Sequence, residues 1–161
     1  MHETGALLLC ATASLCLGLV ACRHDGSALP LSGTLWAHLK DERFGTVTSI
    51  GGLPLGVRDA LQELFHSPSL DIAEPGAEFQ AAGGHVRPGR RLVAAGCSSD
   101  HCLVYYERGG IPHTFHVALL HWTPAATRFE WGGAAPGGLA TIDDVQTAIL
   151  SRRIKGQARF W

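Results

Sequence analysis

Residues 90–131 read RRLVAAGCSSDHCLVYYERGGIPHTFHVALLHWTPAATRFEW, and this stretch decides the fold. Its β-branched and aromatic residues gather in short runs, which polar or glycine-containing turns separate. We expect four consecutive strands over residues 90–97, 102–108, 112–122 and 128–131, each paired antiparallel with the next. Gly109-Gly110 predicts a two-residue turn between the second and third strands, because both glycines accept positive φ.

The first expected hairpin contains two cysteines in a C-x4-C spacing, Cys97 and Cys102. Folding the strands around residues 98–101 places the two cysteines directly opposite one another. Opposed strand residues have Cα atoms about 4.5–5.5 Å apart, a separation that a disulfide spans. We therefore expect a disulfide. The disfavoured alternative is a thiol nucleophile with His101 or His116 as its base.

Two amphipathic helices flank this meander in the sequence. Residues 55–66 carry apolar side chains at helical spacing, which are Val57, Leu61, Leu64 and Phe65. The second helix is expected to begin at Thr141, which suits an N-cap with Asp144 three residues on, and to end at Gly156. Its expected buried stripe comprises Ile142, Val145, Ala148 and Ile149.

A short strand is expected over residues 46–50, and residues 35–40 form either a short helix or a strand. The glycine-rich residues 132–138 are expected to end the sheet. The whole pattern predicts an α+β fold, with an antiparallel β-meander of four to five strands packed on two amphipathic helices through one face. The strand over residues 112–122 is apolar on both faces, so it is either a central strand or a surface that awaits a partner.

The chain begins with a short apolar segment that is typical of an export signal. Residues 5–20 carry no charge, and they are too few for the ~20-residue span that a bilayer core needs. The segment closes with Leu19-Val20-Ala21-Cys22, which resembles the lipobox of bacterial lipoproteins. The resemblance implies that Cys22 is lipidated, that the leader is removed and that Arg23 directs the protein to the outer membrane. The alternative is a plain cleaved leader.

These features divide the chain into a signal peptide (residues 1–21), a tether (residues 22–34) and a single domain (residues 35–161). The whole chain has 13 basic and 14 acidic side chains, and Glu3 is the leader's only charge, so the mature chain is formally neutral. Because no basic stripe occurs, we expect no nucleic-acid partner. We expect the periplasmic side of the bacterial envelope, with the membrane reached through the lipid.

Five of the nine histidines fall within residues 85–121, and this cluster raises the question of a metal site. They are His85, His101, His113, His116 and His121. His113 and His116 should point to opposite faces of one strand, and eight residues separate His113 from His121, roughly 26 Å along a strand. We expect His121 to lie opposite Glu130 as a simple cross-strand pair, and Tyr106 opposite His113. Considered alone, these strands predict no metal and no cofactor.

The sequence favours a non-enzymatic accessory protein of the envelope, similar in kind to inhibitor or immunity proteins, with an envelope protein as its partner. The candidate ligand or partner surface comprises His101, Tyr106, His113, His116, His121 and Glu130. One alternative is a metal or small-ligand binder that uses the histidine-rich meander. Another is a hydrolase in which His113, His116 or His121 acts with Glu107 or Glu130.

Overall fold

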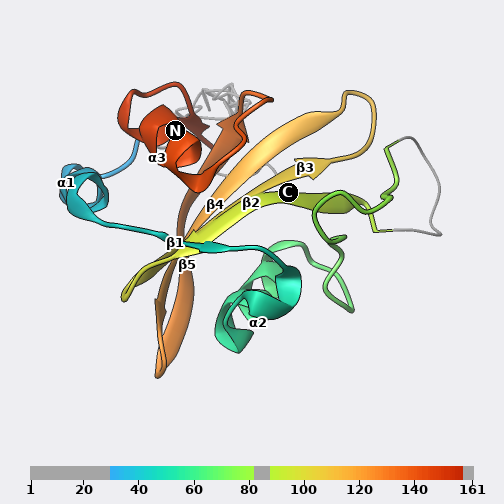
Figure 1. Cartoon of the computed structure of the whole chain (residues 1–161), viewed down its shortest axis with the longest axis horizontal. Helices are drawn as coiled ribbons and strands as arrows, with labels where there is room; N and C mark the ends of the chain where they lie inside the picture. The colour runs from blue at the N-terminus through green and yellow to red at the C-terminus, as the bar shows by residue number, and fades with distance from the viewer. Residues whose placement is uncertain (1–29, 82–87, 158–161) are drawn as a thin grey trace, which may run out of the picture.

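The computed structural model describes residues 30–81 and 88–157, so the leader, Cys22 and His85 lie outside the described residues (Figure 1). Within these ranges the chain forms six strands, three α-helices and one 3-10 helix. In chain order they are α1 (Gly33–Asp41), β1 (Gly45–Val47), η1 (Ile50–Gly52), α2 (Leu55–Leu64), β2 (Arg90–Cys97), β3 (His101–Arg108), β4 (Thr114–Thr123), β5 (Ala126–Ala135), α3 (Ile142–Leu150) and β6 (Lys155–Gly156). The strands form one antiparallel sheet in sequence order.

The α+β class and the meander are thus confirmed, but the expected counts of strands and helices are too low for the described residues. Residues 35–40 belong to the additional helix α1. The additional strand β6 has only two residues, and it exists because Lys155 and Gly156 pair with β5. So short a strand leaves no periodic pattern in the sequence.

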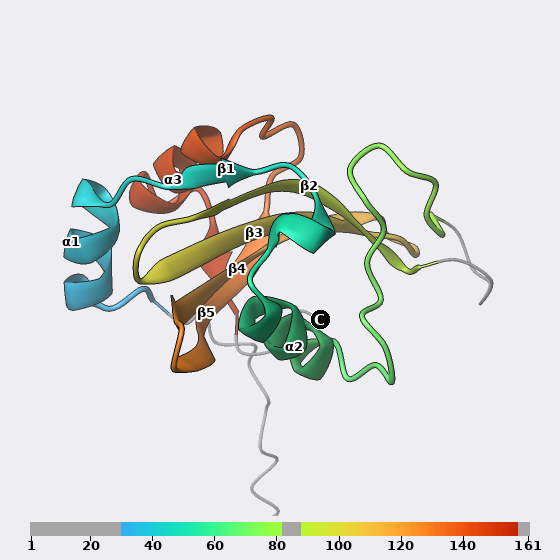
Figure 2. The ribbon, with the colours of Figure 1, turned by 60° about the horizontal axis from the view of Figure 1, so that its bottom comes forward.

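The helices cover both faces of the sheet, which corrects the expectation that they pack on one face. Helices α1 and α3 lie on one side of the sheet and α2 lies on the other (Figures 1 and 2). Odd-numbered residues of β3 and β4, such as Leu103 and Leu119, are buried with α1 and α3. Even-numbered residues, such as Val104 and Leu120, are buried with α2. The apolar character of both faces of β4 is therefore that of a central strand.

Both predicted helix starts are confirmed. Helix α2 begins at Leu55, directly after Pro54. Thr141 caps α3 and forms the full capping box with Asp144, and its hydrogen bonds lower the pKa of that carboxyl group. Helix α3 ends at Leu150, with Arg152 in the left-handed region, rather than at Gly156, which belongs to β6.

The loop between β3 and β4 is longer than the predicted two-residue turn. It runs from residue 109 to residue 113, and Tyr106 consequently pairs with His116 instead of His113. Gly109 and Gly110 donate backbone hydrogen bonds to Gly89 and Ala81, both at 2.9 Å. The two glycines therefore allow neighbouring backbone to approach closely, and they do not form the turn by themselves.

Strand β5 continues through Gly132 and Gly133 to Ala135, whereas the glycines were expected to end it. A Cβ atom on Gly133 would collide with the carbonyl oxygen of Lys155, so glycine is what allows β6 to pair there. The β4–β5 turn closes at Thr123 and Ala126, which places His121 opposite Arg128 and not opposite Glu130.

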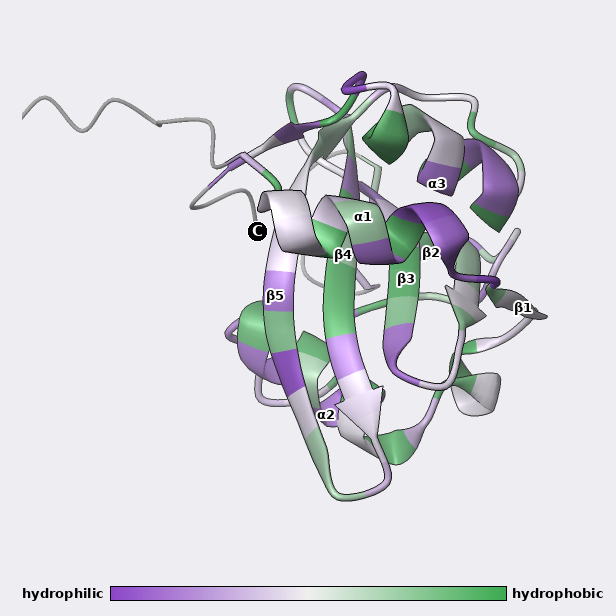
Figure 3. Ribbon diagram, turned by 90° about the vertical axis from the view of Figure 1, so that its left-hand side faces the viewer, coloured by the Kyte–Doolittle hydropathy of each residue, from purple (hydrophilic) through white to green (hydrophobic). Residues whose placement is uncertain are grey.

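A β-bulge lies in β5 at Glu130. Leu119 pairs with Trp131 and Leu120 pairs with Phe129, so Glu130 is the extra residue between them. Its carboxylate reaches His101 on the face that α1 covers. Helix α1 crosses β3, β4 and β5 on this face (Figure 3).

None of the described helices is both long and apolar enough to span a membrane.

Candidate metal centre

The first hairpin of the meander places His101 firmly. Cys97 and Cys102 pair directly across β2 and β3 and are joined by a disulfide, with Cα atoms 4.1 Å apart. The predicted disulfide is therefore confirmed. The Ser98 backbone N–H donates to the His101 carbonyl oxygen at 2.7 Å, and the Ser98 hydroxyl accepts from the His101 N–H at 2.9 Å. Because covalent and hydrogen bonds fix both ends of this turn, the His101 backbone has little freedom.

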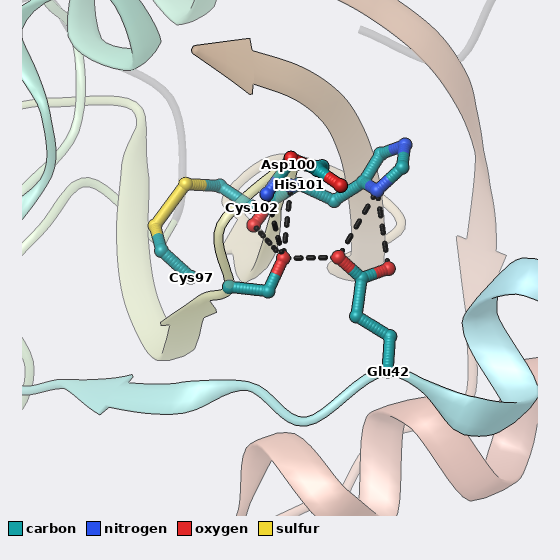
Figure 4. The surroundings of a disulfide bond; sticks show 6 residues. Glu42, Cys97, Asp100, His101 and Cys102 are labelled. Atoms are coloured by element: carbon teal, nitrogen blue, oxygen red, sulfur yellow. Dashed lines mark hydrogen bonds and ion pairs between the residues drawn. A yellow bond between two sulfur atoms is a disulfide. The ribbon is translucent and has the colours of Figure 1, made fainter. Parts of the chain in front are cut away.

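The side chain of His101 is buried between two carboxylates. Its Nδ1 atom lies 3.1 Å from both carboxylate oxygens of Glu42, which follows directly after α1 (Figure 4). Its Nε2 atom lies 3.1 Å from Oε2 of Glu130, the bulged residue of β5. The Glu42 and His101 side chains are 8% and 6% exposed. Each nitrogen of one ring therefore faces its own carboxylate, inside the protein.

Two more imidazoles complete the group. His38 precedes Glu42 by one helical turn, and its Nε2 atom is 3.7 Å from Oε2 of Glu42. His121 pairs with His101 across β3 and β4, and their ring centroids are 5.4 Å apart. We call these five residues, His38, Glu42, His101, His121 and Glu130, the imidazole–carboxylate cluster.

The cluster contains two sets of three ligand atoms, each set lying within 4.8 Å. One set comes from His38, Glu42 and His101, and the other from His101, His121 and Glu130. Imidazole nitrogen and carboxylate oxygen are the ligands that Zn²⁺ and other divalent transition metals take in proteins.

Neighbouring polar groups orient the two carboxylates. The Ser98 hydroxyl donates to Oε1 of Glu42, and Nη2 of Arg128 donates to Oε1 of Glu130 at 2.6 Å. Both interactions leave Oε2 available on the side of the imidazoles. Oε2 of Glu42 is buried and accepts no hydrogen bond from the described residues. Such outer partners are what hold metal-ligating carboxylates in position.

Helix α3 fixes the end of α1 from which Glu42 projects. The Gln146 side-chain amide donates to the carbonyl oxygens of Leu39 at 2.7 Å and Glu42 at 2.8 Å. The Trp36 indole donates to the Leu150 carbonyl at 3.3 Å. These bonds satisfy carbonyls that a helix end would otherwise leave unpaired.

Four of the five cluster residues, His38, His101, His121 and Glu130, line a groove of about 550 Å³ between α1 and the turn ends of β3–β5, while Glu42 is buried beside His101. Asp100, Arg128 and Phe129 contribute to its wall. The His38 side chain is 48% exposed, so the groove gives solvent access to the cluster. The four lining residues are therefore open to a small ion from solvent, whereas Oε2 of Glu42 is buried.

The structure divides the six sequence-predicted surface residues among three places. His101, His121 and Glu130 meet in the cluster. Tyr106 and His116 stack on the opposite face of the sheet, with ring centroids 5.5 Å apart. His113 lies in the loop between β3 and β4, and its Nε2 atom is 2.9 Å from Oε2 of Glu107.

Tyr106 and His116 lie outside the cluster, and burial shifts the pKa values of both side chains. Burial raises the pKa of the Tyr106 hydroxyl. Burial, with Arg108 and Arg90 nearby, lowers the pKa of His116 to about 4. Thr114 Oγ1 lies 2.8 Å from His116 Nε2. The imidazole is neutral at pH 7, and we regard the pair as part of the core beneath α2.

The Glu107 site contains one of the His–carboxylate pairs on which the hydrolase hypothesis rests. Arg91 also pairs with the buried Glu107, and the Arg91 guanidinium lies 4.6 Å from the Phe79 ring centroid. The Cys97–Cys102 disulfide leaves Cys97 without the free thiol that the thiol-nucleophile alternative requires.

Sequence reasoning missed His38 and Glu42. Their i,i+4 spacing would place both on one face of a helix. The sequence of residues 35–40, however, did not distinguish a helix from a strand. Comparison of the chain with protein-family models, with curated proteins and with solved structures finds no match.

Proposed function

We propose that this domain binds a divalent transition metal at the imidazole–carboxylate cluster. The observation that carries the proposal is the convergence of three imidazoles and two carboxylates in two sets around His101, beside a groove that four of the five residues line. Zinc and copper(II) are the ions that this mixed nitrogen and oxygen set fits best.

The buried carboxylate of Glu42 distinguishes this cluster from an ordinary surface ion pair. A buried anionic oxygen that accepts no hydrogen bond is costly, since it has lost its water without a full replacement. The oxygen concerned is Oε2 of Glu42, which lies on the side of His38 and His101. A bound cation would give this oxygen a stronger partner than the two imidazole nitrogens that lie 3.1 Å and 3.7 Å from it.

Metal content and thermal stability test this proposal. The purified chain should retain zinc or copper(II) after desalting, and added zinc should raise its melting temperature, because an ion that binds only the folded state stabilises it. His121→Ala should reduce this response, because it removes one ligand from one of the two sets. His113→Ala is the matched control, because it removes an imidazole–carboxylate pair outside the cluster. Metal-free protein whose melting temperature does not change with either ion would overturn the proposal.

We also propose that the chain is tethered to the periplasmic side of the bacterial envelope through a lipid on Cys22. The lipobox-like sequence and the disulfide of a chain with an export signal support this location. Radiolabelled palmitate should enter the protein in bacterial cells and should not enter a Cys22→Ser variant. Equal labelling of the two chains would contradict the anchor.

The loop between β3 and β4 favours a second function, the binding of an envelope protein. Ile111 in this loop is 97% exposed, and it is the more exposed of the two large apolar side chains that reach solvent among the described residues. A photo-crosslinking residue at position 111 should join the chain to a defined partner in envelope membranes. The same residue at Leu55, an apolar position that is 65% exposed, is the control. Equal crosslinking at both positions would count against a specific contact.

A further inference from the structure

The two nitrogens of His101 face two different sets of ligands. On the Nδ1 side lie Glu42 and, one helical turn earlier, His38. On the Nε2 side lies Glu130, and His121 on the neighbouring strand belongs to the same set of ligand atoms. The two sets have only His101 in common.

A single ion cannot use both sets. The lone pairs of Nδ1 and Nε2 point away from the ring in divergent directions, so one ion coordinates one of them. Zn²⁺ binds nitrogen and oxygen at about 2.0–2.2 Å, and atoms within 4.8 Å of one another reach that distance from a common centre through small side-chain movements. An ion on one side therefore leaves the other imidazole–carboxylate pair without a metal.

We propose that the cluster is a dinuclear centre, with one metal ion on each nitrogen of His101 and with His101 as the bridging imidazolate. This inference rests on the proposed metal-binding function and extends it. Binding of both ions displaces the ring N–H proton, which leaves to solvent, because each nitrogen then donates its lone pair to a metal. The two glutamates and the imidazolate together carry three negative charges against the four positive charges of two divalent ions.

The surroundings of His101 suit a bridging role. The hairpin turn and the disulfide fix its backbone, while the outer ligands of each set come from separate parts of the fold. The Nδ1 set depends on α1 and its C-terminal end, and the Nε2 set depends on β4 and β5. Each half can therefore be removed by substitution without altering the residues of the other half.

Copper(II) titration of the purified chain, followed by metal analysis and electron paramagnetic resonance, tests the bridge. We expect two copper ions per chain, with a signal per copper well below that of an isolated ion because the bridging imidazolate couples the two spins. His38→Ala combined with Glu42→Gln should leave one ion with its full signal. His121→Ala combined with Glu130→Gln should do the same.

The outcomes separate this inference from the function on which it rests. One copper per unsubstituted chain, or two coppers with full uncoupled signals, would overturn the bridge and leave metal binding in place. No bound copper or zinc would overturn both. The unsubstituted chain gives the decisive spectrum, so the test does not depend on the folding of any variant, and His113→Ala should reproduce that spectrum.

Discussion

His101 and His116 show how the same residue type acquires different chemistry on the two faces of one sheet. Both are almost fully buried, at 5% and 4% exposure. His101 lies between two carboxylates, and both of its nitrogens can take part in polar interactions with them. His116 lies among apolar groups near Arg90 and Arg108, and these surroundings disfavour a positive charge. The side of the sheet therefore decides whether a histidine faces carboxylates or lies in the core beneath α2.

The low pKa of His116 makes the stability of the fold depend on pH. Its pKa of about 4 in the folded protein lies below the ordinary value of 6.5, so the unfolded chain binds more protons between these values. This contribution is fully present above pH 6.5 and is lost as the pH falls toward 4. Nearby guanidinium groups are partly screened by solvent, so we expect a loss on the order of 1 kcal/mol between pH 7 and pH 5.

Chemical denaturation of the parent chain and of His116→Gln at these two pH values measures the effect. The variant lacks the titrating ring, so its free energy of unfolding should change less with pH than that of the parent. The stability difference between the two chains should consequently shrink at pH 5. An unchanged difference would show that His116 does not titrate in this range.

At the scale of elements, the sequence predicted the features that depend on short-range interactions along the chain. The capping box of Thr141 and the opposed cysteines of the first hairpin were predictable, because each depends on a few neighbouring residues. The bulge at Glu130 was not predictable, because it depends on the register of β4 and β5 and on a β4–β5 turn that is two residues shorter than expected. Three of the five cluster residues, His101, His121 and Glu130, were therefore predicted as candidates, but their arrangement was not.

Helix α1 was the other part that sequence reasoning left open, and it supplies or adjoins the remaining two ligands, His38 and Glu42. It is nine residues long, and short isolated helices are marginal, so its conformation depends on tertiary contacts. The bonds that Gln146 makes to the carbonyls of Leu39 and Glu42 are among those contacts.

Gln146 is therefore a positioning residue for the Nδ1 side of the cluster. Gln146→Leu should lower zinc affinity severalfold while the number of bound ions at saturation stays the same, because every ligand remains but Glu42 is held less firmly. Isothermal titration calorimetry measures both quantities. Gln62→Leu is the control, since Gln62 makes a similar bond to the Pro68 carbonyl on the opposite side of the sheet. Equal losses in the two variants would indicate a general effect on stability.

At the scale of the whole molecule, the central strands β3 and β4 belong to both apolar cores. Leu103 and Val117 face the core with α3, while Val104 and Ala118 face the core with α2. Neither core can open without exposing the other side of the same strands. We therefore expect the described domain to unfold as one cooperative unit.

Large-to-small substitutions on the two faces test this cooperativity. Leu61→Ala in α2 and Ile149→Ala in α3 remove buried side chains from opposite cores, and each should lower the free energy of unfolding by about 3 kcal/mol. In both variants, tryptophan fluorescence and far-UV circular dichroism should report the same single transition. Separate transitions for the two probes would show that the faces unfold independently.

The place of α1 in the chain has a mechanical consequence. It is the first helix or strand on the N-terminal side of the described domain, and two of the five cluster residues lie on it or directly after it. A pull on the chain from that side reaches the sheet through α1, and detachment of α1 would carry His38 and Glu42 away from His101. Bound metal would then raise the force that the domain withstands, and a sufficient force would release the metal.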